Sequence, residues 1–132
     1  MDVRPLDKKL SVSSQITTDD VEALKAQGFR AIISNRPDGE EAAQSTAYDI
    51  EAAAKRAGLA FHHIPVVGGA IGEDALSGAD GPVLAFCRTG TRAASLWALS
   101  HAGMTPAATL LDHAKAAGHD LSGLRGRLDG AA

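Results

Sequence analysis

Short apolar segments alternate with longer amphipathic ones along most of the chain. The apolar segments have the length and composition of β-strands and lie at 10–13, 30–35, 59–66 and 82–87. The last of them, PVLAFC, is apolar throughout, which is typical of a strand that is buried on both faces of a sheet. Helical spacing and end signals predict helices at 16–29, 45–58, 91–103 and 105–118, and a short helix or turn at 120–128.

The alternation of strands and helices predicts an α/β protein with a mainly parallel central sheet flanked by helices. A chain of 132 residues fits one domain, which we expect to span 1–132 with residues 126–132 as a flexible tail. Ligands of such sheets bind beyond the carboxyl ends of the strands. Cys87 lies at that end of the most buried predicted strand.

The composition narrows the possible partners and locations. The chain is 45% hydrophobic and 22% charged, with a net charge of −3 and no basic tract, which argues against nucleic acid as a partner. It has no apolar run near the roughly 20 residues that span a bilayer and no signal-peptide pattern, so we expect a cytoplasmic protein without membrane contact. The single cysteine excludes an intrachain disulfide, and the histidine spacing predicts neither a metal nor another cofactor.

The loop after the last strand combines a thiol with groups that bind anions. It reads CRTGTR from Cys87 to Arg92. Gly90 allows a positive φ, so successive backbone N–H groups can turn inward as an anion nest, and the next helix adds its positive dipole end. Arg92 can add a planar guanidinium, and the same field favours the Cys87 thiolate. One loop could therefore supply a nucleophile and an oxyanion cradle, the alternative being a buried structural cysteine.

Four longer stretches, together covering most of the chain, lie at 11–41, 63–69, 81–99 and 116–128. They resemble the bacterial beta-lactamase-hydrolase-like phosphatase family, a branch of the cysteine-dependent, dual-specificity-type phosphatases. The resemblance implies a phosphatase-like fold, Cys87 as the nucleophile and Arg92 as the residue that binds phosphate and the transition state. It also implies a substrate-binding phosphate loop whose backbone comes from Arg88, Thr89, Gly90, Thr91, Arg92 and Ala93. The partner would be a small anionic substrate or a phosphorylated protein.

The spacing within the loop departs from the wider phosphatase pattern. Five residues separate Cys from Arg in the phosphatase signature, whereas four separate Cys87 from Arg92, and Ala93 holds the next position. A loop of this length resembles that of the rhodanese sulfurtransferases, and its tighter cradle suits a persulfide. Three functions therefore stay open: a phosphatase with a phosphocysteine intermediate, a sulfurtransferase with a persulfide on Cys87, and a non-catalytic phosphate- or sulfate-binding module.

A general acid is not evident from the sequence. The family's acid follows the preceding strand, where Glu73 and Asp74 are the nearest candidates; both also suit the start of a helix. The connection between that loop and residue 81 is too short for a long helix, so part of one face of the sheet could be covered by a second subunit. The chain could therefore form a homo-oligomer.

A second loop, NRPDGEE at 35–41, is expected on the same rim as Cys87. Asp38 and Glu40 could supply an acid and Arg36 could contact an anion, although Asp38 equally suits a Pro-Asp-Gly turn. We expect Trp97 in the core. His101, His113 and His119 lie near predicted helix ends and are interpreted as structural.

Overall fold

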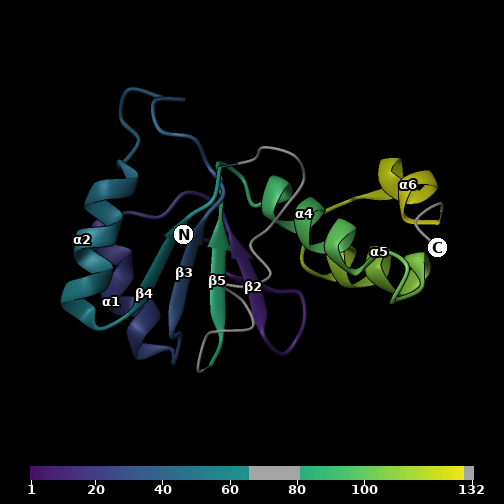
Figure 1. Cartoon of the computed structure of the whole chain (residues 1–132), viewed down its shortest axis with the longest axis horizontal. Coiled ribbons are helices and arrows are strands. Elements are labelled where there is room, and N and C mark those ends of the chain that lie inside the picture. Colours follow the sequence, from purple (N-terminus) through teal and green to yellow (C-terminus); the bar gives the residue numbers. More distant parts are fainter. Residues whose placement is uncertain (66–80, 130–132) are drawn as a thin grey trace.

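A sheet of five strands forms the centre of the computed structural model, which describes residues 1–65 and 81–129 (Figure 1). The strands lie in the order β1-β2-β5-β3-β4. β1 pairs antiparallel with β2, and every other pair is parallel. The strands span Arg4–Pro5 (β1), Leu10–Ser13 (β2), Ala31–Ser34 (β3), Ala60–His63 (β4) and Val83–Phe86 (β5). The predicted α/β fold with a mainly parallel sheet is confirmed.

Helices flank both sides of this sheet, with α1 and α2 on one side and α4, α5 and α6 on the other (Figure 1). They span Thr18–Ala26 (α1), Ala47–Ala57 (α2), Thr91–His101 (α4), Ala107–Ala116 (α5) and Arg125–Asp129 (α6), with a 3-10 turn at Ser122–Leu124 (η1). None of the helices in the described ranges has the length and hydropathy to cross a membrane.

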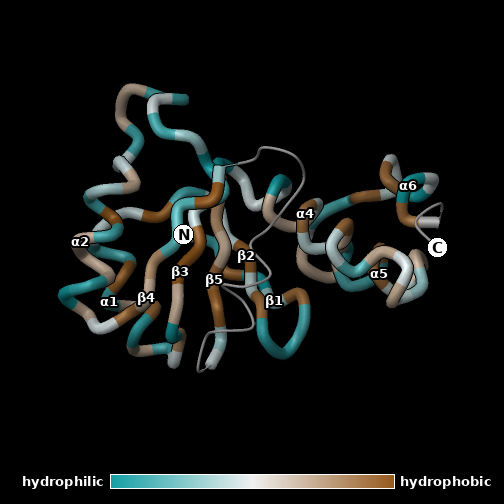
Figure 2. Tube along the Cα trace, viewed as in Figure 1, coloured by the Kyte–Doolittle hydropathy of each residue, from teal (hydrophilic) through white to brown (hydrophobic). Residues whose placement is uncertain are grey.

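Side chains of the central strands alternate between two hydrophobic cores, one on each face. Ala31, Val83 and Ala85 belong to the core under α4, α5 and α6. Ile32 and Leu84, next to them in the chain, belong to the core under α1 and α2. This alternation follows from the period of two residues in a strand. All four residues of β5 are buried, as the uninterrupted apolar segment predicts, and Figure 2 shows the concentration of apolar residues on the central strands.

The helix ends follow ordinary capping chemistry. The backbone N–H of Thr17 donates to Asp20 at 2.8 Å at the start of α1, and Thr46 accepts from the N–H of Asp49 at 3.1 Å at the start of α2. Gly58 ends α2 with a φ of +82°. These features explain why both helices begin, and α2 ends, within two residues of the predicted bounds.

The structure differs from the sequence pattern at both ends of the chain. The pattern does not predict β1, because Arg4–Pro5 is too short and polar to register as a strand. The tail expected from residue 126 is helical as far as Asp129, and Leu128 is only 3% exposed because it packs into the core under α4 and α5. The short helix predicted at 120–128 accounts for this region.

Candidate active site

The carboxyl ends of three neighbouring strands meet around Cys87. The register places Ser13 of β2 and Ser34 of β3 opposite Phe86, the last residue of β5. The N–H of Cys87 donates to the carbonyl of Ser13 at 3.3 Å, and the N–H of Asn35 donates to that of Phe86 at 2.9 Å. The segments that follow β2, β3 and β5 are therefore brought together at one edge of the sheet, where α/β proteins bind ligands.

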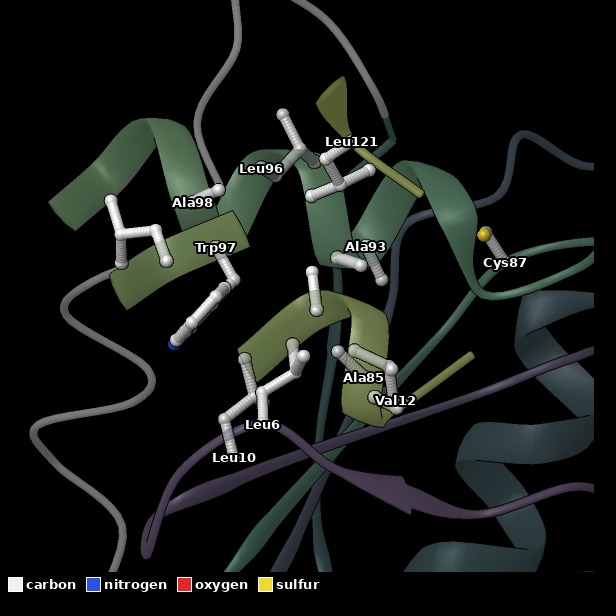
Figure 3. Close-up of a cluster of buried hydrophobic side chains, with 14 of the residues drawn as sticks. Leu6, Leu10, Val12, Ala85, Cys87, Ala93, Leu96, Trp97, Ala98 and Leu121 are labelled. Carbon is white, nitrogen blue, oxygen red and sulfur yellow. The ribbon is translucent and has the colours of Figure 1, made fainter. Parts of the chain in front are cut away.

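Cys87 lies between the buried core and the start of α4. Its residue is 1% exposed, and its Sγ accepts a hydrogen bond from the backbone N–H of Gly90 at 3.1 Å. Figure 3 shows the sulfur beside the first turn of α4, at the margin of the hydrophobic cluster. Gly90 caps α4 with a φ of +94°, which favours glycine and lets the loop turn its amides toward the sulfur. The first-turn amides of α4 add a positive helix end next to the thiol.

Arg92 forms a fork-to-fork ion pair with Glu40. Its Nη1 and Nη2 donate to Oε2 and Oε1 of Glu40, both at 2.9 Å. The sequence separates the two residues by 52 positions, and the parallel pairing of β3 with β5 brings them together. Hydrogen bonding to Glu40 is the main cause that raises the pKa of Arg92, and the Coulombic attraction of Cys87 adds to it.

Arg36 is a buried arginine at the same site. Its side chain is 2% exposed, although an arginine is rarely buried without partners. Nε donates to Glu40 at 2.9 Å and Nη1 donates to Gln15 at 2.8 Å. Nη2 faces Glu41 at 3.2 Å as an ion pair, with no hydrogen bond to any described residue. The guanidinium thus joins the loops that follow β2 and β3.

A pocket of about 320 Å³ lies between these arginines, and its lining consists of Arg36, Glu40, Glu41, Arg88 and Arg92. Arg88 lies at the exposed edge, where its Nε contacts Glu41 at 2.9 Å. The hydrogen bonds of Arg92, followed by those of Arg36, lower the pKa of Glu40 to about 2. Glu40 is therefore a carboxylate at neutral pH in this arrangement, and a carboxylate cannot donate a proton.

The other residues that the sequence predicted for the site do not line this pocket among the described residues. Thr89 and Thr91 are exposed on the loop, with their hydroxyls 3.2 Å apart, whereas the side chain of Ala93 is buried in the core. Asp38 accepts from the N–H of Ala47 at 2.8 Å, so it holds the start of α2 and does not line the pocket. Glu73 and Asp74 lie outside the described residues.

The sequence did not predict that His119 contacts the loop. Its Nδ1 lies 3.1 Å from Oγ1 of Thr91, which is 28 residues away in the chain. A methyl group added to Gly90 would lie 3.1 Å from the His119 ring. Burial is the main cause that lowers the pKa of His119. The signal that the sequence offered was the position of His119 directly after Gly118, the glycine that ends the predicted helix at 105–118.

The fold of the chain matches the fold of solved PTP-like phosphatases. It matches Tk-PTP in its active form with a TM-score of 0.64 at 15% identity, covering 96% of this chain and 90% of that one. It also matches TpbA of P. aeruginosa with a TM-score of 0.57 at 18% identity, covering 97% and 91% of the two chains. Similarity at such low identity demonstrates the fold alone.

Sequence comparison identifies the family of the chain. The chain belongs to the phosphatase-like domains of the Beta-lactamase hydrolase-like proteins, whose family model matches residues 2–104. A candidate phosphatase from Neisseria meningitidis is 38% identical, with a TM-score of 0.85 over 100% of this chain and 99% of that one. The chain is therefore a member of a phosphatase-like family, as the resemblance predicts.

The curated relatives are much longer than this chain. The Beta-lactamase hydrolase-like protein of Xylella fastidiosa is 40% identical over 107 residues, which are 76% of this chain and 25% of that protein. Its counterpart in Agrobacterium fabrum is 37% identical over 125 residues, which are 88% of this chain and 29% of that protein. The chain thus spans about a quarter of the length of these relatives.

Proposed function

We propose that the chain is a cysteine-dependent phosphatase that hydrolyses a phosphate monoester through a phosphocysteine intermediate on Cys87. The observation that supports this most strongly is the hydrogen bond from the Gly90 amide to the buried Sγ, at the start of α4. An amide donor and a helix N-terminus both favour a thiolate over a thiol. A nucleophile and an anion-binding loop therefore occupy one place in a chain of phosphatase-like fold.

The reaction takes place in two displacements. The Cys87 thiolate attacks phosphorus, the ester P–O bond breaks, and the leaving oxygen takes up a proton. Water then attacks the phosphocysteine, the P–S bond breaks, and inorganic phosphate leaves with the thiolate regenerated. The loop amides and Arg92 stabilise the negative charge on the transferring phosphoryl group. Arg92 does so from a position that Glu40 holds.

The pocket carboxylates constrain the leaving group. Glu40 forms ion pairs with Arg92 and Arg36 that favour its ionised form, and Glu41 is held in ion pairs with Arg36 and Arg88. Without a proton donor from these residues, we expect aryl phosphates, whose leaving groups are stable as anions, to react much faster than alkyl phosphates. Glu73 and Asp74 remain predicted candidates for an acid. If either one acts as a general acid, alkyl phosphates will be hydrolysed at comparable rates.

A sulfurtransferase is the second candidate, because four residues separate Cys87 from Arg92. In that reaction the Cys87 thiolate takes the sulfane sulfur from a donor such as thiosulfate, releasing sulfite. The resulting persulfide then passes this sulfur to a nucleophilic acceptor such as cyanide, forming thiocyanate.

The two reactions are separated by assaying an aryl phosphate, and thiosulfate with cyanide, with the wild-type chain and the Cys87→Ser variant. We expect release of phosphate by the wild type and none by C87S. Thiocyanate formation without phosphate release would contradict the phosphatase. If neither product forms but phosphate raises the melting temperature, the chain is a binding module.

A further inference from the structure

The pocket beside Cys87 has an unusual charge balance. Its described lining contains three arginines and two glutamates and no aromatic ring. Each glutamate contacts two of the arginines: Glu40 bridges Arg92 and Arg36, and Glu41 bridges Arg36 and Arg88. Two carboxylates of the chain itself thus mark two neighbouring positions at which this pocket holds an anion.

The two carboxylates are held with different strength. Glu40 accepts three hydrogen bonds of 2.9 Å, one of them from the buried Arg36, and its side chain is 30% exposed. Glu41 is 51% exposed: it pairs with Arg88, which is 65% exposed, and contacts the buried Arg36 at 3.2 Å without a hydrogen bond. Ion pairs between exposed side chains contribute little, because water and salt screen them. Glu41 is therefore the carboxylate that another anion can displace, whereas Glu40 remains bound to Arg92 and holds it in position.

The buried guanidinium of Arg36 supplies the second reason for a ligand at this position. Its Nη2 has no hydrogen bond among the described residues and reaches only Glu41, at 3.2 Å. A buried charged group without a full set of hydrogen bonds is costly, so a ligand that completes the set is favoured. An anion in the place of the Glu41 carboxylate would meet Nη2 of Arg36 and the guanidinium of Arg88 together.

We propose that Arg36 and Arg88 form a second anion-binding subsite beside the Cys87 loop, which Glu41 covers in the free protein. The substrate is then a small phosphate monoester with a second anionic group, a carboxylate or another phosphate, a few bonds from the phosphate that reacts. This inference rests on the proposed function, because it assigns the reacting phosphate to the Cys87 loop. An aromatic phosphopeptide fits less well, since the described lining offers no ring to stack on.

The test compares phosphonates, which resist hydrolysis, as ligands of the whole chain. Methylphosphonate carries one anionic group, and phosphonoacetate and its homologues with longer methylene spacers carry two. Binding is measured by calorimetry and as inhibition of aryl-phosphate hydrolysis. We expect the best carboxy-phosphonate to bind at least about tenfold more tightly than the alkyl phosphonate of the same chain length, which is the size of one charged hydrogen bond.

Three variants locate the effect. Glu41→Gln should bind the best carboxy-phosphonate several-fold more tightly, because the internal competitor is gone. Glu51→Gln removes the same charge from α2, where Glu51 pairs with Lys55, and should leave the affinity unchanged. Arg88→Gln should abolish the preference for the second anionic group. The melting temperature of each variant establishes that it is folded.

The outcomes separate this inference from the proposed function. If methylphosphonate and the carboxy-phosphonates inhibit equally, or if E41Q weakens binding, the subsite is wrong although the phosphatase stands. If a phosphotyrosine peptide binds more tightly than every carboxy-phosphonate, the substrate class is wrong. If no phosphonate binds and no aryl phosphate is hydrolysed, the proposed function fails, and the subsite fails with it.

Discussion

Glu40 sets the position of two arginines at once. Its carboxylate accepts twice from Arg92 and once from Arg36, and these hydrogen bonds lower its pKa to about 2. A carboxylate that is ionised at neutral pH holds the planar guanidinium of Arg92 in one orientation before a substrate binds, so that less side-chain entropy is lost on binding. At the residue scale, Glu40 therefore holds the two arginines of the anion site in place and is unsuited to donate a proton.

The Glu40→Gln variant tests this role through pH dependence. The carboxyl has a pKa of about 2 in the folded chain against an ordinary value of 4.5, so the unfolded chain takes up the proton first as the pH falls. The ion pairs therefore stabilise the fold above about pH 4.5, and this stabilisation is lost as the pH falls toward 2. E40Q should show a shallower fall of melting temperature across this interval than the wild type. Parallel curves for both proteins would contradict this role, and E51Q, whose ion pair is exposed, should follow the wild type.

At the scale of elements, the turn from β5 into α4 builds the site. Hydrogen bonds tie its start to the segments after β2 and β3, and Gly90 reverses the chain at its end. Gly90 is buried between the His119 ring and the backbone of Ser13, which would lie 3.1 and 3.4 Å from an added methyl group. The turn therefore needs glycine for its positive φ and for space.

Two glycine variants separate these requirements. Gly58 at the end of α2 also has a positive φ, +82°, but an added methyl group would meet nothing within 4 Å. Gly58→Ala should lower the free energy of unfolding by about 1–2 kcal/mol, the cost of a left-handed conformation for alanine. Gly90→Ala should lower it by more, because the methyl group also contacts His119. Denaturant unfolding of both variants measures the difference, and equal losses would show that the contact with His119 does not matter.

The sequence predicted most elements of this turn, and the features that it did not predict were missed for physical reasons. The apolar segment, Gly90 and the helical spacing after it are local signals, so β5, the turn and α4 were all expected. The burial of Arg36 was not, because an arginine after a strand is usually exposed. The Glu40–Arg92 and Thr91–His119 contacts join residues 52 and 28 positions apart, and only the assembled sheet brings them together.

At the scale of the whole molecule, the sheet separates two cores that share β3 and β5. Ile32 and Ile33 are adjacent in β3 and both fully buried, but Ile32 packs under α1 and α2 and Ile33 under α4 and α5. Sequence patterns predicted which strand would be most buried. They did not predict the strand order β1-β2-β5-β3-β4, because strand pairing depends on the crossovers between strands.

Matched truncations of the two isoleucines test the division into two cores. Ile32→Ala and Ile33→Ala should each lower the free energy of unfolding by about 2–5 kcal/mol, because each leaves a cavity in a packed core. Amide hydrogen exchange should then quicken in α1 and α2 for I32A, and in α4 and α5 for I33A. The same pattern of exchange in both variants would contradict two separate cores.

The proposed reaction places a phosphoryl group on Cys87 during each catalytic cycle. Mixing the chain with an aryl phosphate, quenching in milliseconds and digesting for mass spectrometry would reveal a covalent intermediate. We predict an initial burst of the released phenol. We also predict a phosphoryl group on the peptide that contains Cys87 and on no other peptide. Phosphate release without a burst and without modification of that peptide, or a persulfide in its place after incubation with thiosulfate alone, would contradict the phosphocysteine mechanism.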